Sequence, residues 1–388
     1  MERIHLKRSL IFFLGSVIAI GGISACSIPG GISGQMNNAA ATTSEIIAVD
    51  NEQSFQRLMQ DVSQHKVVYI GETHGRYDHH LNQLAVIEEL HERGADFAIG
   101  LEFFQRPFQQ YLDRYIAGEI DEKLLLKRTG SYKNRAYDFR LYRPILEYAR
   151  DNGIALVALN APSELVSRVS NKGFRGLSEE WRNQLPEVRI PADDSYKRRL
   201  QRVFDMHSHS GRQFETFLQV QLLWDEYMAE SAASYLQQHP DRQLVVLAGS
   251  GHVAFGSGIP QRVQRRIPHE YTVLVSAGPE SGRMDSAEHI LLANDDQLPV
   301  AGKLGIYIGE TGGEVTVRRL LRGHVADVVE DVLPGDLITS IAGERIRSME
   351  DVRLAMLDRQ PGEQALIELE RGRTDGRQVR VATVIELI

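Results

Sequence analysis

The 388-residue chain has a single cysteine, which excludes a fold held together by disulfides. It also lacks an excess of basic residues. Its formal net charge is −8, whereas a nucleic-acid-binding protein needs clustered Lys and Arg. Long apolar runs are missing as well, which excludes a protein that spans a membrane several times. With 42% hydrophobic residues the chain can instead build large cores, and its length corresponds to roughly two or three domains.

The first 25 residues have the pattern of a secretory signal. Basic residues outnumber acidic ones before residue 9, and Leu10–Ile20 is apolar but short for a membrane span. Small residues then lead to the triplet Ile23-Ser24-Ala25, as at a cleavage site. We therefore expect a signal peptide over residues 1–25.

The lone cysteine, Cys26, directly follows that triplet. The arrangement resembles a bacterial lipobox, in which the cysteine is lipid-modified and forms the mature N-terminus. Ser27 follows where Asp is usual for inner-membrane retention, so the resemblance implies an anchor at the periplasmic face of the outer membrane. Residues 26–45 are rich in Gly, Ser, Asn, Ala and Thr, which predicts a flexible tether. The alternative is an ordinary cleaved signal with an incidental cysteine.

A three-layer α/β domain with a mostly parallel sheet is predicted over residues 46–298. Continuous apolar runs suit strands buried on both faces, and they recur at Val67–Ile70, Phe97–Leu101, Ala155–Leu159, Leu244–Ala248 and Tyr271–Val275. Helical patterns lie between them, which gives the strand–helix alternation of this fold class. Residues 163–211 show no strand pattern, and we expect a helical insertion there that forms a lid or a ligand wall.

Polar side chains follow these strands where each one ends. Glu72 and His74 come after the first strand, Glu102 after the second, Asn160 after the third and His252 after the fourth. The carboxyl ends of parallel strands share one edge of the sheet, and ligands bind in the crevice there. Buried charge is costly unless it is paired or used, so this pattern indicates a functional site. The alternative is a structural Glu–His network that ties the strand ends together.

These motifs resemble a known superfamily. Gly71-x-x-His74, Glu102 and Gly251-His252 are similar to the motifs shared by haem-binding ChaN lipoproteins, Tiki proteases, TraB proteins and erythromycin esterases. The ChaN haem-uptake branch is resembled in particular by the helix Gln221–Ser231, and also by Val68–Gly75, Tyr142–Leu146 and Leu159–Pro162. The resemblance implies an extracytoplasmic protein of iron acquisition that binds haem, as a homodimer with pockets at the interface.

The resemblance also implies a tyrosine ligand to the haem iron and a histidine near a propionate. Tyr142 and Tyr132 are the candidate axial ligands, although most tyrosines in such a cluster are packing residues. The remaining candidates supply imidazole or guanidinium groups to iron or to propionates: His207, His209, Arg143, His74 and His252.

A hydrolase is the alternative function. Glu72 or His74 would then act as the general base, and Glu102 and His252 would orient it or join it in holding Zn²⁺ or another divalent metal. Neither a His-Glu-x-x-His helix nor a Gly-x-Ser-x-Gly elbow supports this hypothesis. The sequence therefore leaves open whether the protein is an enzyme.

Residues 303–388 change to short strands with one helix, which opens at a capping box at Ser348. This stretch resembles a PDZ domain of the bacterial periplasmic-protease type, with Lys303–Ile306 as the carboxylate-binding loop and Pro334-Gly335-Asp336 as a turn. The resemblance implies that a protein C-terminus binds as an added strand, on Leu304, Gly305, Ile306, Ile308 and Leu354. One departure is Glu330-Asp331-Val332, where Ala-Gly-Leu is common. The alternative is that this domain only stabilises contacts within the chain or between the subunits of a dimer.

Overall fold

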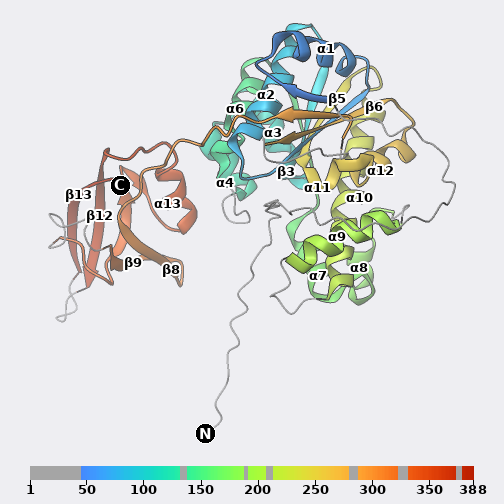
Figure 1. The fold of residues 1–388 in the computed structure, drawn as a ribbon. Coiled ribbons are helices and arrows are strands. Elements are labelled where there is room, and N and C mark those ends of the chain that lie inside the picture. The colour runs from blue at the N-terminus through green and yellow to red at the C-terminus, as the bar shows by residue number, and fades with distance from the viewer. Residues whose placement is uncertain are drawn as a thin grey trace, which may run out of the picture. The chain divides into compact units, whose positions relative to one another are not determined.

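The computed structural model describes residues 45–131, 138–187, 191–206, 213–278, 287–321, 331–372 and 378–388 (Figure 1). They form two compact units that divide between Gln297 and Leu298. The predicted signal peptide and Cys26 lie outside the described residues, as do Tyr132, His207 and His209. Across the described ranges, no helix combines the length and apolarity needed to cross a membrane.

The first unit is built on a parallel seven-stranded sheet with the order β1-β7-β6-β2-β5-β3-β4. Every registered pair is parallel, which confirms the fold class predicted from the apolar runs. The strands are β1 (Glu45–Ala48), β2 (Val67–Glu72), β3 (Phe97–Gln105), β4 (Ala155–Asn160), β5 (Gln243–Gly249), β6 (Tyr271–Ala277) and β7 (His289–Leu292).

Helices cover both faces of this sheet (Figure 1). Before the insertion come α1 (Glu52–Val62), α2 (Tyr77–Glu92), α3 (Gln109–Ile116), α4 (Glu122–Thr129) and α6 (Arg143–Asp151). The predicted insertion contains α7 (Ser163–Lys172), α8 (Glu179–Arg182) and α9 (Asp194–Met206), and no strand among its described residues. After it come α10 (Phe214–Gln238), α11 (Ser250–Val253) and α12 (Ile259–Arg266).

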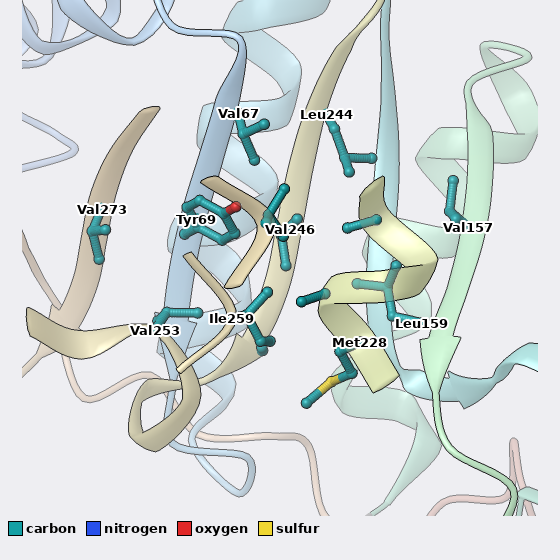
Figure 2. Packing of buried hydrophobic residues seen from close by; sticks show 14 of the residues in the cluster. Val67, Tyr69, Val157, Leu159, Met228, Leu244, Val246, Val253, Ile259 and Val273 are labelled. Carbon is teal, nitrogen blue, oxygen red and sulfur yellow. The ribbon is translucent and has the colours of Figure 1, made fainter. Parts of the chain in front are cut away.

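The long helix α10 packs on one face of the sheet. Its Met228 lies with Leu159 of β4, Tyr69 of β2 and Ile259 of α12 in one apolar cluster (Figure 2). Successive strand residues point to opposite faces, so Tyr69 faces α10 while the even-numbered residues of β2, up to Glu72, face α2. All six residues of β2 are buried, as expected for a strand covered on both sides. The side-chain direction of Glu72 is thus set by its place in the strand.

The second unit is a separate antiparallel sheet with the order β13-β12-β10-β9-β8, in which β11 pairs with β10. Its elements are β8 (Ile306–Thr311), β9 (Glu314–Leu320), β10 (Leu337–Ile341), β11 (Glu344–Arg345), α13 (Met349–Ala355), β12 (Gln364–Gly372) and β13 (Gln378–Glu386). Ser348 caps α13 by accepting from the Asp351 backbone N–H at 3.2 Å. Buried Asp336 accepts two 2.8 Å hydrogen bonds from the Arg371 guanidinium, which ties the turn before β10 to β12.

Candidate functional site

The structure brings the strand-end residues of the first unit together. Glu72 ends β2, His74 follows it, Glu102 lies on β3, and His252 lies on α11 after β5. The Nε2 atoms of His74 and His252 both face Oε1 of Glu102, each at 3.8 Å. The other Glu102 oxygen accepts from the Gly249 backbone N–H at 2.7 Å, which fixes the carboxylate between the two rings.

Glu72 is a buried and fully engaged carboxylate. It accepts from the Tyr142 hydroxyl at 2.7 Å, from Gln83 Nε2 at 2.7 Å, and faces His74 Nδ1 at 2.8 Å. His80 Nδ1 lies 3.2 Å from its second oxygen. Burial alone would raise the pKa of Glu72, but the His80 and His74 imidazoles and the Tyr142 hydroxyl lower that pKa to about 2. Glu72 is therefore ionised at any physiological pH.

A second carboxylate holds the other imidazole in the same way. Asp225 on α10 is fully buried, and its Oδ1 lies 2.7 Å from His252 Nδ1. Its Oδ2 accepts from the hydroxyl of Tyr196 on α9. Burial would lower the pKa of His252, but the charges of Glu102 and Asp225 raise it to about 9. The pKa of His74 is also raised, because Glu102 and Glu72 outweigh the effect of burial.

Two guanidinium groups of α12 pair with Glu226, which neighbours Asp225 on α10. Arg262 on α12 is only 1% exposed and donates to Glu226 at 2.9 Å and to the Gly258 carbonyl at 2.8 Å. Arg266 donates to the second Glu226 oxygen at 2.7 Å. Gly258 has a φ of +68°, and a Cβ there would lie 2.2 Å from the His252 carbonyl oxygen. This position therefore requires glycine, because any side chain would push α11 away.

With both imidazoles protonated, the charges of the site balance. Each buried carboxylate has a cationic counterpart, since Glu72, Glu102, Asp225 and Glu226 are matched by His74, His252, Arg262 and Arg266. Pairing of this kind offsets the large cost of removing charges from water.

A cleft opens above the imidazoles. Its floor is polar and includes Glu72, His74, Ser250 and His252, and its wall is apolar, with Leu200 and Val203 from α9 and Phe217 from α10. The cleft is open to solvent at its mouth, and its enclosed part has a volume of only about 40 Å³. The insertion predicted as a ligand wall therefore contributes side chains to the cleft through α9.

The predicted zinc site finds no support in the structure. Among the residues that the structure describes, no group of three or more His, Cys, Asp and Glu side chains is arranged to hold a metal ion. We derive no chemical step through a metal.

The other predicted haem contacts are placed differently. Tyr142 is 3% exposed, and its hydroxyl donates to Glu72. The Arg143 guanidinium donates to Glu122 of α4 at 2.8 and 2.6 Å. Of the predicted haem-binding side chains that the structure describes, His74 and His252 line the cleft.

Residues that the strand-end pattern did not single out complete the site. Asp225 was part of the helix that resembles the ChaN branch, and the signal that could have found it is the acidic pair Asp225-Glu226 between the apolar triplets Leu222–Trp224 and Tyr227–Ala229. Gln83 and His80 lie on α2 and reach Glu72 across the sheet face. Tyr196 carries no signal of its own, because its role depends on how α9 packs.

The residues predicted to bind a peptide lie in the second unit. Ile306 and Ile308 are half-buried on β8, which ends the order of that sheet, while Leu304 and Leu354 are buried. Gly305 has a φ of +67°. The Met349 backbone N–H at the start of α13 donates to Glu310 of β8 at 2.8 Å, which links this strand to the helix.

Comparison with known proteins defines the class. A model of the family described as haem-binding uptake, Tiki superfamily, ChaN matches residues 58–263, just over half of the chain. The chain belongs to this family.

Individual relatives are more distant. The protein RETICULATA-RELATED 5, chloroplastic, of Arabidopsis thaliana is 24% identical over 264 residues, which cover 62% of this chain but only 35% of that protein. A solved structure of cofacial heme binding to ChaN of Campylobacter jejuni is 16% identical, with coverage of 61% of this chain and 91% of that one and a TM-score of 0.49.

Two further solved structures are similar to parts of the chain. An erythromycin esterase mutant in its open conformation is 14% identical, covers 87% of this chain and 93% of that one, and has a TM-score of 0.35. An HtrA-type protease with a decapeptide is 22% identical and covers 23% of this chain and 30% of that one, with a TM-score of 0.18.

Proposed function

We propose that the protein binds haem outside the cytoplasm and acts in haem or iron uptake, and that the haem binds across the open mouth of the cleft above His74 and His252. Membership of the haem-binding ChaN family supports the ligand. The observation that carries the proposal is the cleft itself, in which an apolar wall faces two imidazoles across a polar floor. A haem site needs this combination, because the macrocycle is apolar while the iron and the propionates require donors.

Within this site the imidazoles suit the propionates better than the iron. The pKa of His252 is about 9, so its ring is charged at neutral pH and its Nε2 donates a hydrogen bond. A tyrosine is our candidate for the iron. Tyr142 would have to give up its hydrogen bond to the ionised Glu72, so we favour Tyr132 over Tyr142.

A titration with ferric haem tests this proposal. We expect a saturable charge-transfer band typical of phenolate-bound iron, which Tyr132→Phe abolishes. His74→Ala and His252→Ala should weaken binding but keep the band. Tyr115→Phe is the matched control, because Tyr115 is a buried tyrosine of α3 whose hydroxyl contacts Arg150. Featureless and non-saturable binding to the unaltered protein would overturn the proposal.

We also propose that Cys26 carries a lipid and anchors the protein to the periplasmic face of the outer membrane. The support is the Ile23-Ser24-Ala25-Cys26 sequence after a basic and then apolar segment. In a bacterial host, labelled palmitate should enter the protein and the protein should fractionate with outer membranes. Cys26→Ser should lose both properties. Labelling that persists in this variant would contradict the proposal.

The second unit, in our proposal, is a PDZ-type module that binds a protein C-terminus. The peptide would add a strand beside β8, with the Leu304–Ile306 backbone N–H groups on its carboxylate and its last side chain against Ile306, Ile308 and Leu354. Peptides with an apolar C-terminal residue should bind as free acids and lose affinity as C-terminal amides. Equal binding of the acid and the amide would contradict this mode.

A second function, hydrolysis, is favoured by one observation. Each imidazole is oriented at Nδ1 by a carboxylate and faces Glu102 with Nε2, which is an arrangement found around general acids and bases. Because the pKa of His74 is raised and that of Glu72 is about 2, the His74 imidazole would act as a proton donor and Glu72 would only orient it. Ester and peptide substrates should then be cleaved by the protein and not by Glu102→Gln. Cleavage that survives in Glu102→Gln would exclude this site.

The homodimer implied by the family resemblance is the remaining proposal. Sedimentation of the protein with and without haem measures it directly, and a monomer under both conditions would contradict it.

A further inference from the structure

We propose that Tyr196 and Tyr142 are positioning residues, each of which fixes one of the two imidazoles that flank Glu102 through a buried carboxylate. The inference concerns the hydrogen bonds beneath the cleft, and it holds whichever ligand the cleft receives. Neither tyrosine is among the residues that line the cleft.

The first chain of contacts runs from Tyr142 to His74. The Tyr142 hydroxyl donates to Oε1 of Glu72 at 2.7 Å, and the same oxygen lies 2.8 Å from His74 Nδ1, while the hydroxyl itself lies at the longer distance of 3.4 Å from that nitrogen. The tyrosine ring is itself held between Phe103, at a centroid distance of 4.3 Å, and His80, at 4.4 Å. Its hydroxyl is therefore fixed in direction as well as in place.

The second chain runs from Tyr196 to His252. The Tyr196 hydroxyl donates to Oδ2 of Asp225, and Oδ1 of the same carboxylate lies 2.7 Å from His252 Nδ1. Tyr196 is 3% exposed and Asp225 is fully buried, so no solvent competes for this hydrogen bond. The backbone N–H of Tyr196 donates to Asp193 at 2.7 Å, which fixes the first turn of α9 and with it the tyrosine.

The two chains of hydrogen bonds reach Glu102 from different helices and strands. Tyr142 precedes α6 and acts on a residue of β2, whereas Tyr196 lies on α9 and acts on a residue of α10. In both, a carboxylate at Nδ1 fixes the orientation of the ring and leaves Nε2 to face Glu102. A phenylalanine would fill the same space as either tyrosine. The feature that the two chains share is thus a tyrosine hydroxyl that donates a hydrogen bond to a carboxylate.

Tyr196 also connects the imidazole to the cleft wall. Leu200 and Val203 follow it by four and seven residues on α9, so all three lie on one face of the helix. Leu200 and Val203 line the cleft above His252. The α9 helix therefore positions two side chains of the apolar wall and also the tyrosine that donates to Asp225.

The charged groups around His252 set the direction of the expected effect. Its ring faces Glu102 from β3 and Asp225 from α10, Arg262 from α12 lies 3.7 Å from Asp225, and Trp224 presents an aromatic edge at 6.1 Å. The Tyr196 hydroxyl stabilises the negative charge of Asp225. Without it, Asp225 attracts the imidazolium proton more strongly, so the pKa of His252 rises.

The test is an NMR titration of the histidine rings in the intact protein. Tyr196→Phe should raise the pKa of His252 and change that of His74 far less, whereas Tyr142→Phe should raise the pKa of His74 and change that of His252 far less. Tyr115→Phe, the buried control, should move neither. These readings need no haem, so a failure of the haem proposal and a failure of this inference are distinguishable.

A purely structural role would give a different result. If Tyr196→Phe lowers the unfolding midpoint while both imidazoles titrate as in the unaltered protein, or if either variant shifts both rings equally, the inference is wrong. Should Tyr196→Phe not fold, 3-fluorotyrosine at position 196 decides the matter. Its hydroxyl is a stronger donor, so it should lower the pKa of His252, and an unchanged or raised pKa would overturn the proposal.

Discussion

His74 and His252 present their Nε2 atoms to the same oxygen, Oε1 of Glu102, at the same distance of 3.8 Å. One carboxylate thus faces two imidazoles that come from different strands. Because both rings interact with a common charge, a change at Glu102 affects both, and their protons titrate as a coupled system.

Glu102→Gln should lower the pKa of both His74 and His252. Burial already disfavours the charged form of each ring, and the Glu102 charge is the largest influence that opposes it. The glutamine oxygen can still accept from the Gly249 backbone N–H, so the fold is retained. NMR titration of the two rings measures the effect.

Glu164→Gln is the matched control for that variant, because Glu164 lies on the surface of α7, where it pairs with Arg168. It should leave both rings unchanged. An imidazole whose pKa stays the same in Glu102→Gln would show that Glu102 does not hold its charge.

Stability should fall as the pH rises through about 9. The pKa of His252 is raised from its ordinary value of 6.5 to about 9, so the folded protein holds this proton more tightly than the unfolded chain does. The contribution is fully present below pH 6.5 and is lost as the pH passes 9, and it amounts to about 3 kcal/mol. Urea unfolding at a series of pH values checks this. In His252→Gln the free energy of unfolding should fall less steeply between pH 6.5 and pH 9. An equally steep decline in that variant would assign the effect to other groups.

Gly249→Ala should lower the stability of the protein, whereas Gly251→Ala should not. A Cβ at Gly249 would lie 3.0 Å from Cε1 and Nε2 of His74 and 3.6 Å from Glu102, whereas one at Gly251 meets nothing within 4 Å. Crowding of this kind costs about 1–3 kcal/mol in free energy of unfolding. It should also move His74 away from Glu102 and so lower the pKa of that ring. Equal stability of the two variants would contradict the close approach.

Arg262→Ala should be severely destabilising, and Arg265→Ala on the same helix should not. Arg262 is buried, paired with Glu226 and 3.7 Å from Asp225, so its loss leaves Glu226 with Arg266 alone and removes a charge beside Asp225, which costs about 3–5 kcal/mol. Arg265 is exposed, and its removal should change the free energy of unfolding by less than about 0.5 kcal/mol. Denaturant unfolding of both variants provides the comparison, and similar values would refute the buried pair.

Much of the sheet could be predicted because its central strands are continuous apolar runs. The pattern placed β2 at Val67–Ile70, and the structure extends this strand to Glu72. It missed β1 and β7, which have four residues each and lie together at one end of the sheet order, so they are too short to show a period. The α13 helix begins at Met349, earlier than its apolar residues indicate, because Ser348 is its cap.

The site was only partly predictable for a related reason. His74 and His252 follow β2 and β5 as predicted, whereas Glu72 and Glu102 lie within the last residues of β2 and β3, which run further than their apolar cores. The carboxyl ends of parallel strands share an edge however the helices pack. Asp225 and Tyr196 lie on helices, so their direction depends on how α10 and α9 pack. Tyr142 was predicted as a candidate axial ligand to haem iron, and nothing in the sequence indicated that its hydroxyl donates to Glu72.

The order of the strands has a consequence for how the chain folds during synthesis. β5 lies between β2 and β3, and β6 pairs with the other side of β2. β3 can pair with β4 soon after both are synthesised, but the sides of β2 and β3 that pair with β5 stay open until residue 249 has been added. Open edges of apolar strands are prone to aggregate, so the unfinished chain is exposed to aggregation until its middle strand is present.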